Sequence, residues 1–436
     1  MTPVKVGLLG LGTVGSGTAT VLKRNAEEIA RRAGRGIEID FVSTSKSALP
    51  AGLGLANSRI SSDPFDVVND PEISIVVELY GGDEPAKSLV LQAIENGKHV
   101  VTANKALIAK YGNEIFAKAQ DKGVIVAFEA AVAGGIPIIK ALREGLSANK
   151  INWLAGIING TGNFILTEMR DKGRDFQDVL TEAQALGYAE ADPTFDVEGI
   201  DAGHKLSILS SIAFGIPLQF DKTYMEGITK ISREDVDYAA ELGYSIKHLG
   251  IARQSEKGIE QRVHPTLIPK RRLIANVDGV MNAVLVQGDA VGPTLHYGAG
   301  AGSEPTASAV VADIIDITRA LTSDPENRVP HLAFQADALS DQPIVSMDDV
   351  ETAFYLRLSA LDQAGVLANI TQILGDGNIS IEAFIQKEPN KEDGRADIIL
   401  LTKVVNEGDM NKAIANIESL SVVSGQVTRI RVENLS

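Results

Sequence analysis

The chain has 436 residues, of which 44% are hydrophobic and 22% charged, and it contains no cysteine. This length suffices for two or three domains with a large buried core. A formal net charge of −16 argues against nucleic acids and anionic membranes as partners. The lack of thiols excludes disulfides, thiolate metal sites and thiol nucleophiles. Because no apolar stretch could span a bilayer and a strand is expected from Val4, leaving no room for a signal peptide, we expect a cytoplasmic protein.

The beginning of the chain predicts a dinucleotide-binding domain. A buried parallel strand, Val4–Leu9, leads into a glycine turn, and a helix is expected from about Thr13 to Ala33. In this context GxGxxG provides a tight turn, a close approach of the backbone to a pyrophosphate, and amides at a helix N-terminus that face the phosphates. A glycine-rich packing turn is the alternative. The expected cofactor-binding residues are Gly10, Leu11, Gly12, Thr13, Val14 and Gly15.

The end of the second strand, Ile37–Val42, bears on the choice of coenzyme. Sites for NAD usually place an acid here, which holds the ribose 2′-OH. This chain instead has Ser43-Thr44-Ser45-Lys46. Hydroxyls and a lysine suit a 2′-phosphate better than a diol, so NADP is favoured and NAD remains possible. A solvated turn that contacts neither coenzyme is the alternative.

The α/β pattern continues to about residue 135 and places two candidate groups at strand ends. Lys105 follows the strand HVVTA, where open parallel sheets make their ligand contacts. It is a candidate active-site cation, although a lysine that opens a helix is also common on surfaces. The turn from Glu129 to Pro137 offers a carboxylate and backbone carbonyls, which are the ligands of a hard cation. A tight interdomain crossover is an equally natural interpretation of this turn.

From about Ile138 the alternation stops and strands mix with helices, which indicates an α+β domain. The segment Gly187–Lys205 contains five carboxylates and one lysine. Asp201 and Lys205 stand four residues apart where a helix begins, so both should project from one face. Charges on a helix face that packs against a core must be partnered. A solvated acidic loop followed by an ordinary salt bridge is the alternative.

The last part of the chain predicts a return to the first domain and then a separate small domain. A glycine turn ending at Gly302 precedes a helix, which should close the nucleotide-binding domain with Gly302 near the cofactor. After a polar connector, the pattern βαββαβ indicates a ferredoxin-like unit. We therefore predict an α/β fold class with a Rossmann-type parallel sheet at 1–135, completed by about 303–325, an α+β catalytic and dimerisation domain at 136–302, a connector at 326–350 and a ferredoxin-like domain at 351–436.

Seven segments together resemble a bacterial homoserine dehydrogenase along nearly the whole chain. They are GLGTVG at 10–15, VVEL with GG at 76–82, TANK at 102–105, EAAVAGGIPII at 129–139, NGT at 159–161, GYAEADPTFDVEGIDAGHK at 187–205 and GAGAGSEPTASAV at 298–310. The C-terminal domain resembles an ACT domain, the small amino-acid-sensing module. Its loop signature fits Asp362, Gly365, Val366 and Leu367.

The resemblance implies the interconversion of L-aspartate 4-semialdehyde and L-homoserine with a nicotinamide cofactor. It implies that Lys205 is the acid–base residue and that Glu190 and Asp201 bind the substrate. It also implies that Lys105 contacts both nicotinamide and substrate. It also implies a monovalent cation, sodium, at Glu129 and the carbonyls of Val132, Gly134 and Ile136. Thr13, Val14, Gly187 and Gly302 would contact the cofactor. L-threonine would bind near Asp362–Leu367 in a homodimer or homotetramer; a tail that only strengthens oligomerisation is the alternative.

The chemistry of homoserine needs acids for its ammonium and a proton acceptor for its alcohol, which Glu190, Asp201 and Lys205 can supply. Whether Lys205 itself or a relay through water and Asp201 accepts the proton stays open. A Rossmann oxidoreductase for sugars or polyols would leave the acid pair without an ammonium. A non-catalytic amino-acid sensor would not need both Lys105 and Lys205.

One departure from the family concerns the coenzyme: relatives that use NADP often have an arginine after the second strand, where this chain has only Lys46.

Overall fold

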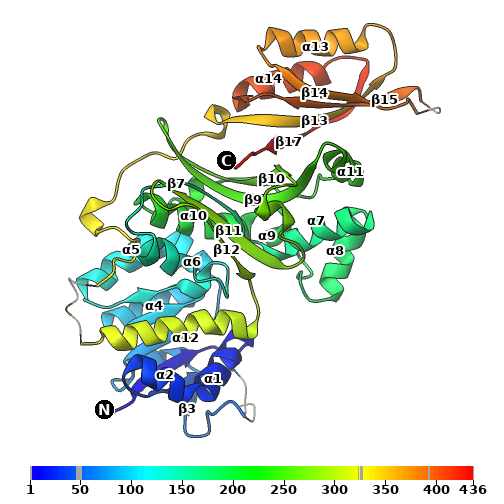
Figure 1. Cartoon of the computed structure of the whole chain (residues 1–436). Coiled ribbons are helices and arrows are strands. Elements are labelled where there is room, and N and C mark those ends of the chain that lie inside the picture. Colours follow the sequence, from blue (N-terminus) through cyan, green and yellow to red (C-terminus); the bar gives the residue numbers. More distant parts are fainter. Residues whose placement is uncertain (1, 46–51, 323, 325–327, 391–392, 436) are drawn as a thin grey trace. The chain divides into compact units, whose positions relative to one another are not determined.

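The computed structural model describes residues 2–45, 52–322, 324, 328–390 and 393–435 (Figure 1). The chain forms two compact units, the first comprising Met1–Gly160, Asp201–Thr223 and Val280–Gln342, and the second Thr161–Ile200, Tyr224–Gly279 and Pro343–Ser436. Segments 136–160, 201–223 and 280–302, which the sequence assigns to the catalytic domain, thus group with the first unit. Within the described ranges, every helix is too short or too polar to cross a membrane.

The first unit contains the predicted parallel sheet, in the order β3-β2-β1-β4-β5-β6. Its strands are β1 (Val4–Leu9), β2 (Ile37–Ser43), β3 (Arg59–Ser61), β4 (Ile75–Glu78), β5 (His99–Thr102) and β6 (Val126–Ala127). The strands β1 and β4 are almost entirely buried apolar runs, as expected for a sheet that is covered on both faces. The strand order reverses between β1 and β4, so the carboxyl ends of these two strands open the crevice in which such sheets bind ligands.

Helices cover this sheet, and the last of them comes from a distant part of the chain. They are α1 (Thr13–Arg24), α2 (Ala26–Ala33), α3 (Pro64–Asn69), α4 (Ala86–Glu95), α5 (Lys105–Asp121) and α12 (Ser303–Ala320). The single helix predicted from Thr13 is in fact two, because Asn25 ends α1 and precedes α2. The helix α12 lies beside α1 (Figure 1), and Arg24 donates two hydrogen bonds to the Glu304 carboxylate at 3.0 and 2.8 Å. The predicted return to the nucleotide-binding domain is therefore present.

The remainder of the first unit carries a second, antiparallel ladder and a buried helix. The ladder pairs β11 with β7 and with β12. In chain order, the helices and strands of this part of the first unit are η1 (Glu129–Ala131), α6 (Ile138–Lys140), η2 (Ala141–Gly145), β7 (Ile151–Ile157), α10 (Ile200–Phe214), η3 (Phe220–Lys222), β11 (Met281–Gly288), β12 (Gly292–Ala299) and η6 (Ala336–Ala338). In α10 every residue from Asp201 to Ala213 is buried. A helix buried on all sides can hold charged side chains only if they are paired, so Asp201 and Lys205 are expected to have partners.

The second unit combines a helical region, a β-hairpin and the ferredoxin-like domain. The first two comprise α7 (Gly160–Lys172), α8 (Phe176–Ala185), α9 (Thr194–Val197), β8 (Tyr224–Met225), α11 (Arg233–Glu241), β9 (Tyr244–Ser255), β10 (Gly258–Pro269) and η4 (Leu273–Asn276). The third comprises η7 (Met347–Asp349), β13 (Glu351–Leu361), α13 (Val366–Asp376), β14 (Ile381–Gln386), β15 (Arg395–Thr402), β16 (Val405–Asn406), α14 (Glu407–Glu418) and β17 (Val423–Val432). Its sheet has the order β17-β13-β15-β14, so the predicted βαββαβ unit is confirmed.

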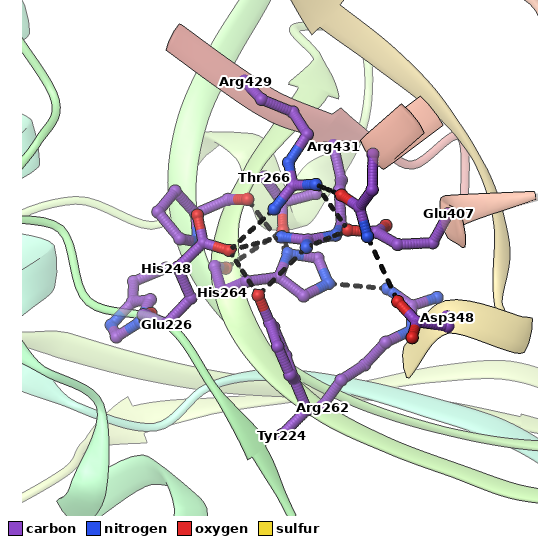
Figure 2. A network of polar contacts seen from close by, with 12 residues as sticks. Tyr224, Glu226, His248, Arg262, His264, Thr266, Asp348, Glu407, Arg429 and Arg431 are labelled. Atoms are coloured by element: carbon purple, nitrogen blue, oxygen red, sulfur yellow. Dashed lines mark hydrogen bonds and ion pairs between the residues drawn. The ribbon is translucent and has the colours of Figure 1, made fainter. Parts of the chain in front are cut away.

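A buried ion-pair network joins the ferredoxin-like domain to the hairpin of β9 and β10 and to the segment beside β8 (Figure 2). The end of β17 pairs in parallel with β10, where Arg431 is opposite Thr266. The Arg431 side chain is fully buried and donates to Glu407 of α14 at 2.9 Å and to Glu226 beside β8 at 2.8 Å. Nearby, Arg262 of β10 donates to Glu433 at 2.6 Å and to the ring of His264. Burial and the two arginines hold the pKa of His264 well below its usual range, so its neutral ring can accept this bond.

Arg431→Met is expected to lower the free energy of unfolding of the second unit by about 3–5 kcal/mol. The substitution removes the fully buried cation that bonds to Glu407 and Glu226 and leaves only the more distant Arg429 beside them. Breaking a buried pair by removing one partner costs far more than the pair itself contributes. The measurement is denaturant unfolding followed by circular dichroism. Lys412→Met is the control, because Lys412 pairs with Asp409 on the exposed face of α14. Equal midpoints for the two variants would contradict the structural role of the network.

Candidate active site

A carboxylate between two lysines lies at the start of α10. One oxygen of Asp201 accepts hydrogen bonds from Lys205 Nζ at 2.7 Å and from Asn159 Nδ2 at 2.9 Å. The other oxygen lies 3.1 Å from Lys105 Nζ. Lys205 Nζ also donates to the Ile158 carbonyl at 2.7 Å. These residues come from α5, the end of β7 and α10, so three elements of the first unit converge on one buried carboxylate. We call Lys105, Asp201 and Lys205 the charged triad.

The charged triad keeps Asp201 ionised. Burial alone would raise the pKa of this carboxyl, but the charges of Lys205 and Lys105 and the hydrogen bonds from Lys205 and Asn159 outweigh it, so the pKa lies well below its usual range. Two ammonium groups and one carboxylate carry one net positive charge. A preorganised positive charge in a water-poor site stabilises negative charge that develops on an oxygen atom.

The two lysines differ in their access to solvent. The Lys205 side chain is 11% exposed, whereas the Lys105 side chain is 36% exposed. Lys105 is the first residue of α5, and Asn104 caps this helix by accepting a hydrogen bond from the Leu107 amide at 3.0 Å. Lys105 can therefore reach an incoming ligand, while Lys205 is enclosed and held by protein oxygens.

The glycine turn between β1 and α1 has the shape that a pyrophosphate needs. A Cβ at Gly10 would lie 3.1 Å from the Leu79 carbonyl oxygen, and one at Gly15 would lie 2.1 Å from the Gly10 carbonyl oxygen. At Gly12, by contrast, no described atom would come within 4 Å of a Cβ. In the described part of the chain, no side chain caps α1 at Gly12 and its first turn holds no acid. Open space in front of helix amides fits a dinucleotide phosphate, and the contacts of residues 10–15 with it stay a prediction.

The other expected cofactor contact of the first unit, Gly302, is the residue before α12. Its φ of +128° lies in a region that side chains rarely adopt. The next residue, Ser303, donates from Oγ to the Thr13 carbonyl at 2.8 Å. The Gly302 backbone is thereby held beside the first turn of α1, where the amides of Thr13 and Val14 lie.

The end of β2 differs from the expected phosphate site. The strand continues to Ser43, whose side chain is fully buried and makes a 2.8 Å hydrogen bond with the Tyr80 hydroxyl. Thr44 is also buried, and Ser45 is exposed. Lys46 lies outside the described residues. Ser43 is therefore not an exposed donor for a 2′-phosphate, which removes part of the argument for NADP.

The predicted cation turn is tightly hydrogen-bonded. The Glu129 carboxylate accepts from the amides of Ile139 and Lys140 at 2.9 and 2.8 Å, and the Ile136 carbonyl accepts from the Ile138 amide at 2.8 Å. Burial and the nearby Asp313 raise the pKa of Glu129 to about 7. A Cβ at Gly134 would lie 2.5 Å from the Gly300 carbonyl oxygen, so packing accounts for this glycine.

The described residues contain no group of three or more histidines and acids that could hold a metal ion. The predicted sodium site consists mostly of backbone carbonyls and contains one carboxylate, Glu129. Carboxylate and carbonyl oxygens keep a second lone pair after accepting one hydrogen bond, so the donor set at Glu129, Val132, Gly134 and Ile136 fits a hard cation. Their role as ligands stays a prediction.

Glu190 and Gly187 lie in the second unit, whereas the charged triad lies in the first. Gly187 follows α8 with a φ of +75°, and the exposed Glu190 has its carbonyl bound by Gln184 at 3.0 Å. The expected effector residues lie at the N-terminus of α13. There Gly365 has a φ of +92°, and Asp362 accepts from the Gln386 amide group at 3.1 Å. Val366 is buried and Leu367 is half-buried. The roles of all these residues stay predictions.

One residue of the site was missed from the sequence. Asn159 is buried, donates to Asp201, and begins the segment NGT, which is separated from β7 by one residue. A polar residue after a buried strand was the available signal, because strand ends commonly carry the polar groups of a site. Spacing and residue type alone do not single out this segment, which belongs to the family resemblance.

Comparisons with known proteins identify the family of the chain. Residues 10–129 match the NAD-binding domain of homoserine dehydrogenase, residues 137–315 match the homoserine dehydrogenase family, and residues 354–422 match the ACT domain. Homoserine dehydrogenases of Pseudomonas aeruginosa and Neisseria gonorrhoeae are 68% and 58% identical, each aligned over 100% of both chains.

Solved structures give the same result. The crystal structure of a homoserine dehydrogenase from Thiobacillus denitrificans has a TM-score of 0.95 and 68% identity, covering 100% of this chain and 99% of that one. A hyperthermophilic archaeal homoserine dehydrogenase in complex with NADPH has a TM-score of 0.63 and 26% identity, covering 73% of this chain and 98% of that one. The chain belongs to the homoserine dehydrogenase family of oxidoreductases.

Proposed function

We propose that the chain interconverts L-homoserine and L-aspartate 4-semialdehyde, and that the charged triad is its reaction site. The observation that carries this proposal is the buried Asp201 carboxylate between Lys105 and Lys205, in the same unit as the glycine turn. A small zwitterionic alcohol requires charged partners for orientation and a group that exchanges a proton with its oxygen.

The chemistry that a nicotinamide would supply here, when bound, is hydride exchange with the carbon of the alcohol or aldehyde. In the reductive direction, protonated Lys205 gives a proton to the oxygen that forms the alcohol. In the oxidative direction, neutral Lys205 takes this proton, and a relay through water and Asp201 is the alternative route. Lys105, the more exposed lysine, contacts nicotinamide and substrate. Glu190 joins Asp201 in binding the substrate ammonium.

The coenzyme contacts are proposed for the glycine turn, for Gly187 and for Gly302. NADP is favoured over NAD because Ser45 is exposed at the end of β2 and the sequence continues with Lys46. The archaeal relative was solved with NADPH. A sodium ion at Glu129 and the carbonyls of Val132, Gly134 and Ile136 would fix the turn that leads into α6.

The ACT domain supports a regulatory proposal. L-threonine, as an end product, would bind near Asp362–Leu367 and lower activity, in a homodimer or homotetramer of this chain. The reaction would then be a regulated cytoplasmic step in threonine, methionine and isoleucine biosynthesis. Allostery requires that threonine bind the less active state more tightly.

The test is the initial rate of change in nicotinamide absorbance with L-homoserine and NADP or NAD, in sodium-containing buffer at alkaline pH. Reduction of the coenzyme is expected, faster with NADP, and slower when L-threonine is added. In a parallel assay, 4-hydroxybutanoate, which lacks the ammonium, is expected to react far more slowly. Equal rates with this analogue would favour a general alcohol oxidoreductase, and no reaction with either coenzyme would favour a non-catalytic amino-acid sensor.

A further inference from the structure

Two neighbouring strands of the parallel sheet end in a buried polar pair. Glu78 ends β4 and Thr102 ends β5, and the two residues are paired directly across the strands. Both side chains are fully buried, and Thr102 Oγ1 lies 2.6 Å from one Glu78 carboxylate oxygen. The other oxygen accepts hydrogen bonds from the amides of Tyr80 and Gly81 at 2.8 and 3.2 Å.

The chain of hydrogen bonds continues from Thr102 to the start of α5. The Asn104 amide donates to Thr102 Oγ1 at 3.0 Å. The Asn104 side chain donates to the Gly82 carbonyl at 2.7 Å and accepts from the Leu107 amide at 3.0 Å, which caps α5. Lys105 is the next residue, and its Nζ lies 3.1 Å from Asp201. Asn104 therefore holds the backbone before and after Lys105, and Asn104 is itself held by Thr102, which is bonded to Glu78.

The direction of these bonds follows from the donors available. A threonine hydroxyl has one proton, and Thr102 Oγ1 already accepts from an amide, so its own proton goes to the Glu78 carboxylate. A bond from a hydroxyl to a carboxylate is short and strong, in agreement with the 2.6 Å separation. Valine has the shape of threonine but no hydroxyl, so it would leave the Asn104 amide without this acceptor.

We propose that Glu78 and Thr102 are positioning residues for the reaction. They fix the carboxyl ends of β4 and β5 together, so that α5 begins with Lys105 directed at Asp201 while the 80–82 turn is held beside it. The strand order reverses between β1 and β4, and β5 is the next strand after β4, so the two ends belong to the side of the sheet where such folds bind ligands. This inference rests on the proposed contact of Lys105 with nicotinamide and substrate.

The test compares Thr102→Val with Thr102→Ser, which keeps the hydroxyl. Rates are expressed per coenzyme-binding site, so loss of folded protein does not count. Thr102→Val is expected to lower kcat for homoserine oxidation by about tenfold or more, because small displacements of a reacting group have large effects on rate. Thr102→Ser should restore most of the rate. The control is Thr318→Val, which removes another buried hydroxyl, bonded to the Ile314 carbonyl at 2.8 Å in α12, and should leave kcat unchanged.

The pH dependence separates positioning from a purely structural role. The charge of Lys105 near Asp201 opposes protonation of Lys205. Withdrawing Lys105 should therefore move the rise of homoserine oxidation to higher pH in Thr102→Val, as in Lys105→Met. If Lys105→Met keeps full turnover, the proposed role of Lys105 fails. If Lys105→Met is impaired while Thr102→Val keeps the wild-type rate and pH profile, only the positioning inference is overturned.

Discussion

Lys205→Met is expected to lower kcat by ~10²-fold or more in both directions while coenzyme affinity stays nearly unchanged. Lys205 Nζ is enclosed by Asp201 and the Ile158 carbonyl, and its side chain is 11% exposed. Methionine preserves the length of the side chain but cannot exchange a proton. The glycine turn that fits the pyrophosphate does not depend on this residue. The measurements are initial rates in both directions and a fluorescence titration with reduced coenzyme.

The control for this prediction is Lys118→Met in α5. Lys118 is 51% exposed and lies 3.7 Å from Glu114, so its loss should leave both rates and affinity unchanged. Retained turnover in Lys205→Met would contradict its role as the proton-exchanging group and would move that role to water and Asp201. A parallel loss of coenzyme affinity would instead indicate a role in binding.

Asp201→Asn is expected to lower both turnover and stability. The substitution removes the charge that holds two lysines together, which should lower kcat by ~10²-fold. Breaking a buried ion pair costs about 3–5 kcal/mol, and we expect the lower end, about 3 kcal/mol, because Lys105 is partly exposed. Initial rates and denaturant unfolding at neutral pH measure the two effects.

The pH dependence of stability tests the same residue. The pKa of Asp201 lies below its unfolded value of about 3.9, so its ionisation contributes stability that is complete above about pH 4 and is lost as the pH falls through the folded-state pKa. Wild-type protein should therefore lose stability below about pH 4 more steeply than Asp201→Asn. Asp83→Asn, which removes an exposed partner of Lys110, should retain the wild-type slope. Parallel slopes for wild type and Asp201→Asn would contradict the electrostatic role of the carboxylate.

The sheets and their order along the chain could be predicted from the sequence because local patterns determine them. The run Val4–Leu9 followed by the glycine turn defined the first strand and α1, and the βαββαβ pattern defined the C-terminal domain. The break at Asn25 was not accessible, since the residues on both sides favour a helix. The burial of Ser43 was missed for a related reason: the strand runs one residue further than its apolar letters suggest, which places the hydroxyl inside.

Contacts of the site between residues close in the sequence could be predicted, whereas contacts between distant segments could not. Asp201 and Lys205 are one helical turn apart, so their ion pair could be predicted and is present. The approach of Lys105 to the same carboxylate joins α5 to α10, and no spacing rule relates these segments. The same holds for Asn159 and for the pair of Glu78 with Thr102, which become neighbours only when the strands align.

The pH dependence of kcat in both directions tests the central claim, proton exchange at the charged triad, most directly. Homoserine oxidation needs neutral Lys205 and is expected to rise towards alkaline pH, because the ordinary pKa of a lysine is about 10.4. Semialdehyde reduction needs the protonated form and should run well near neutrality. A flat oxidation profile from about pH 6 to about pH 10 would contradict Lys205 as the titrating group.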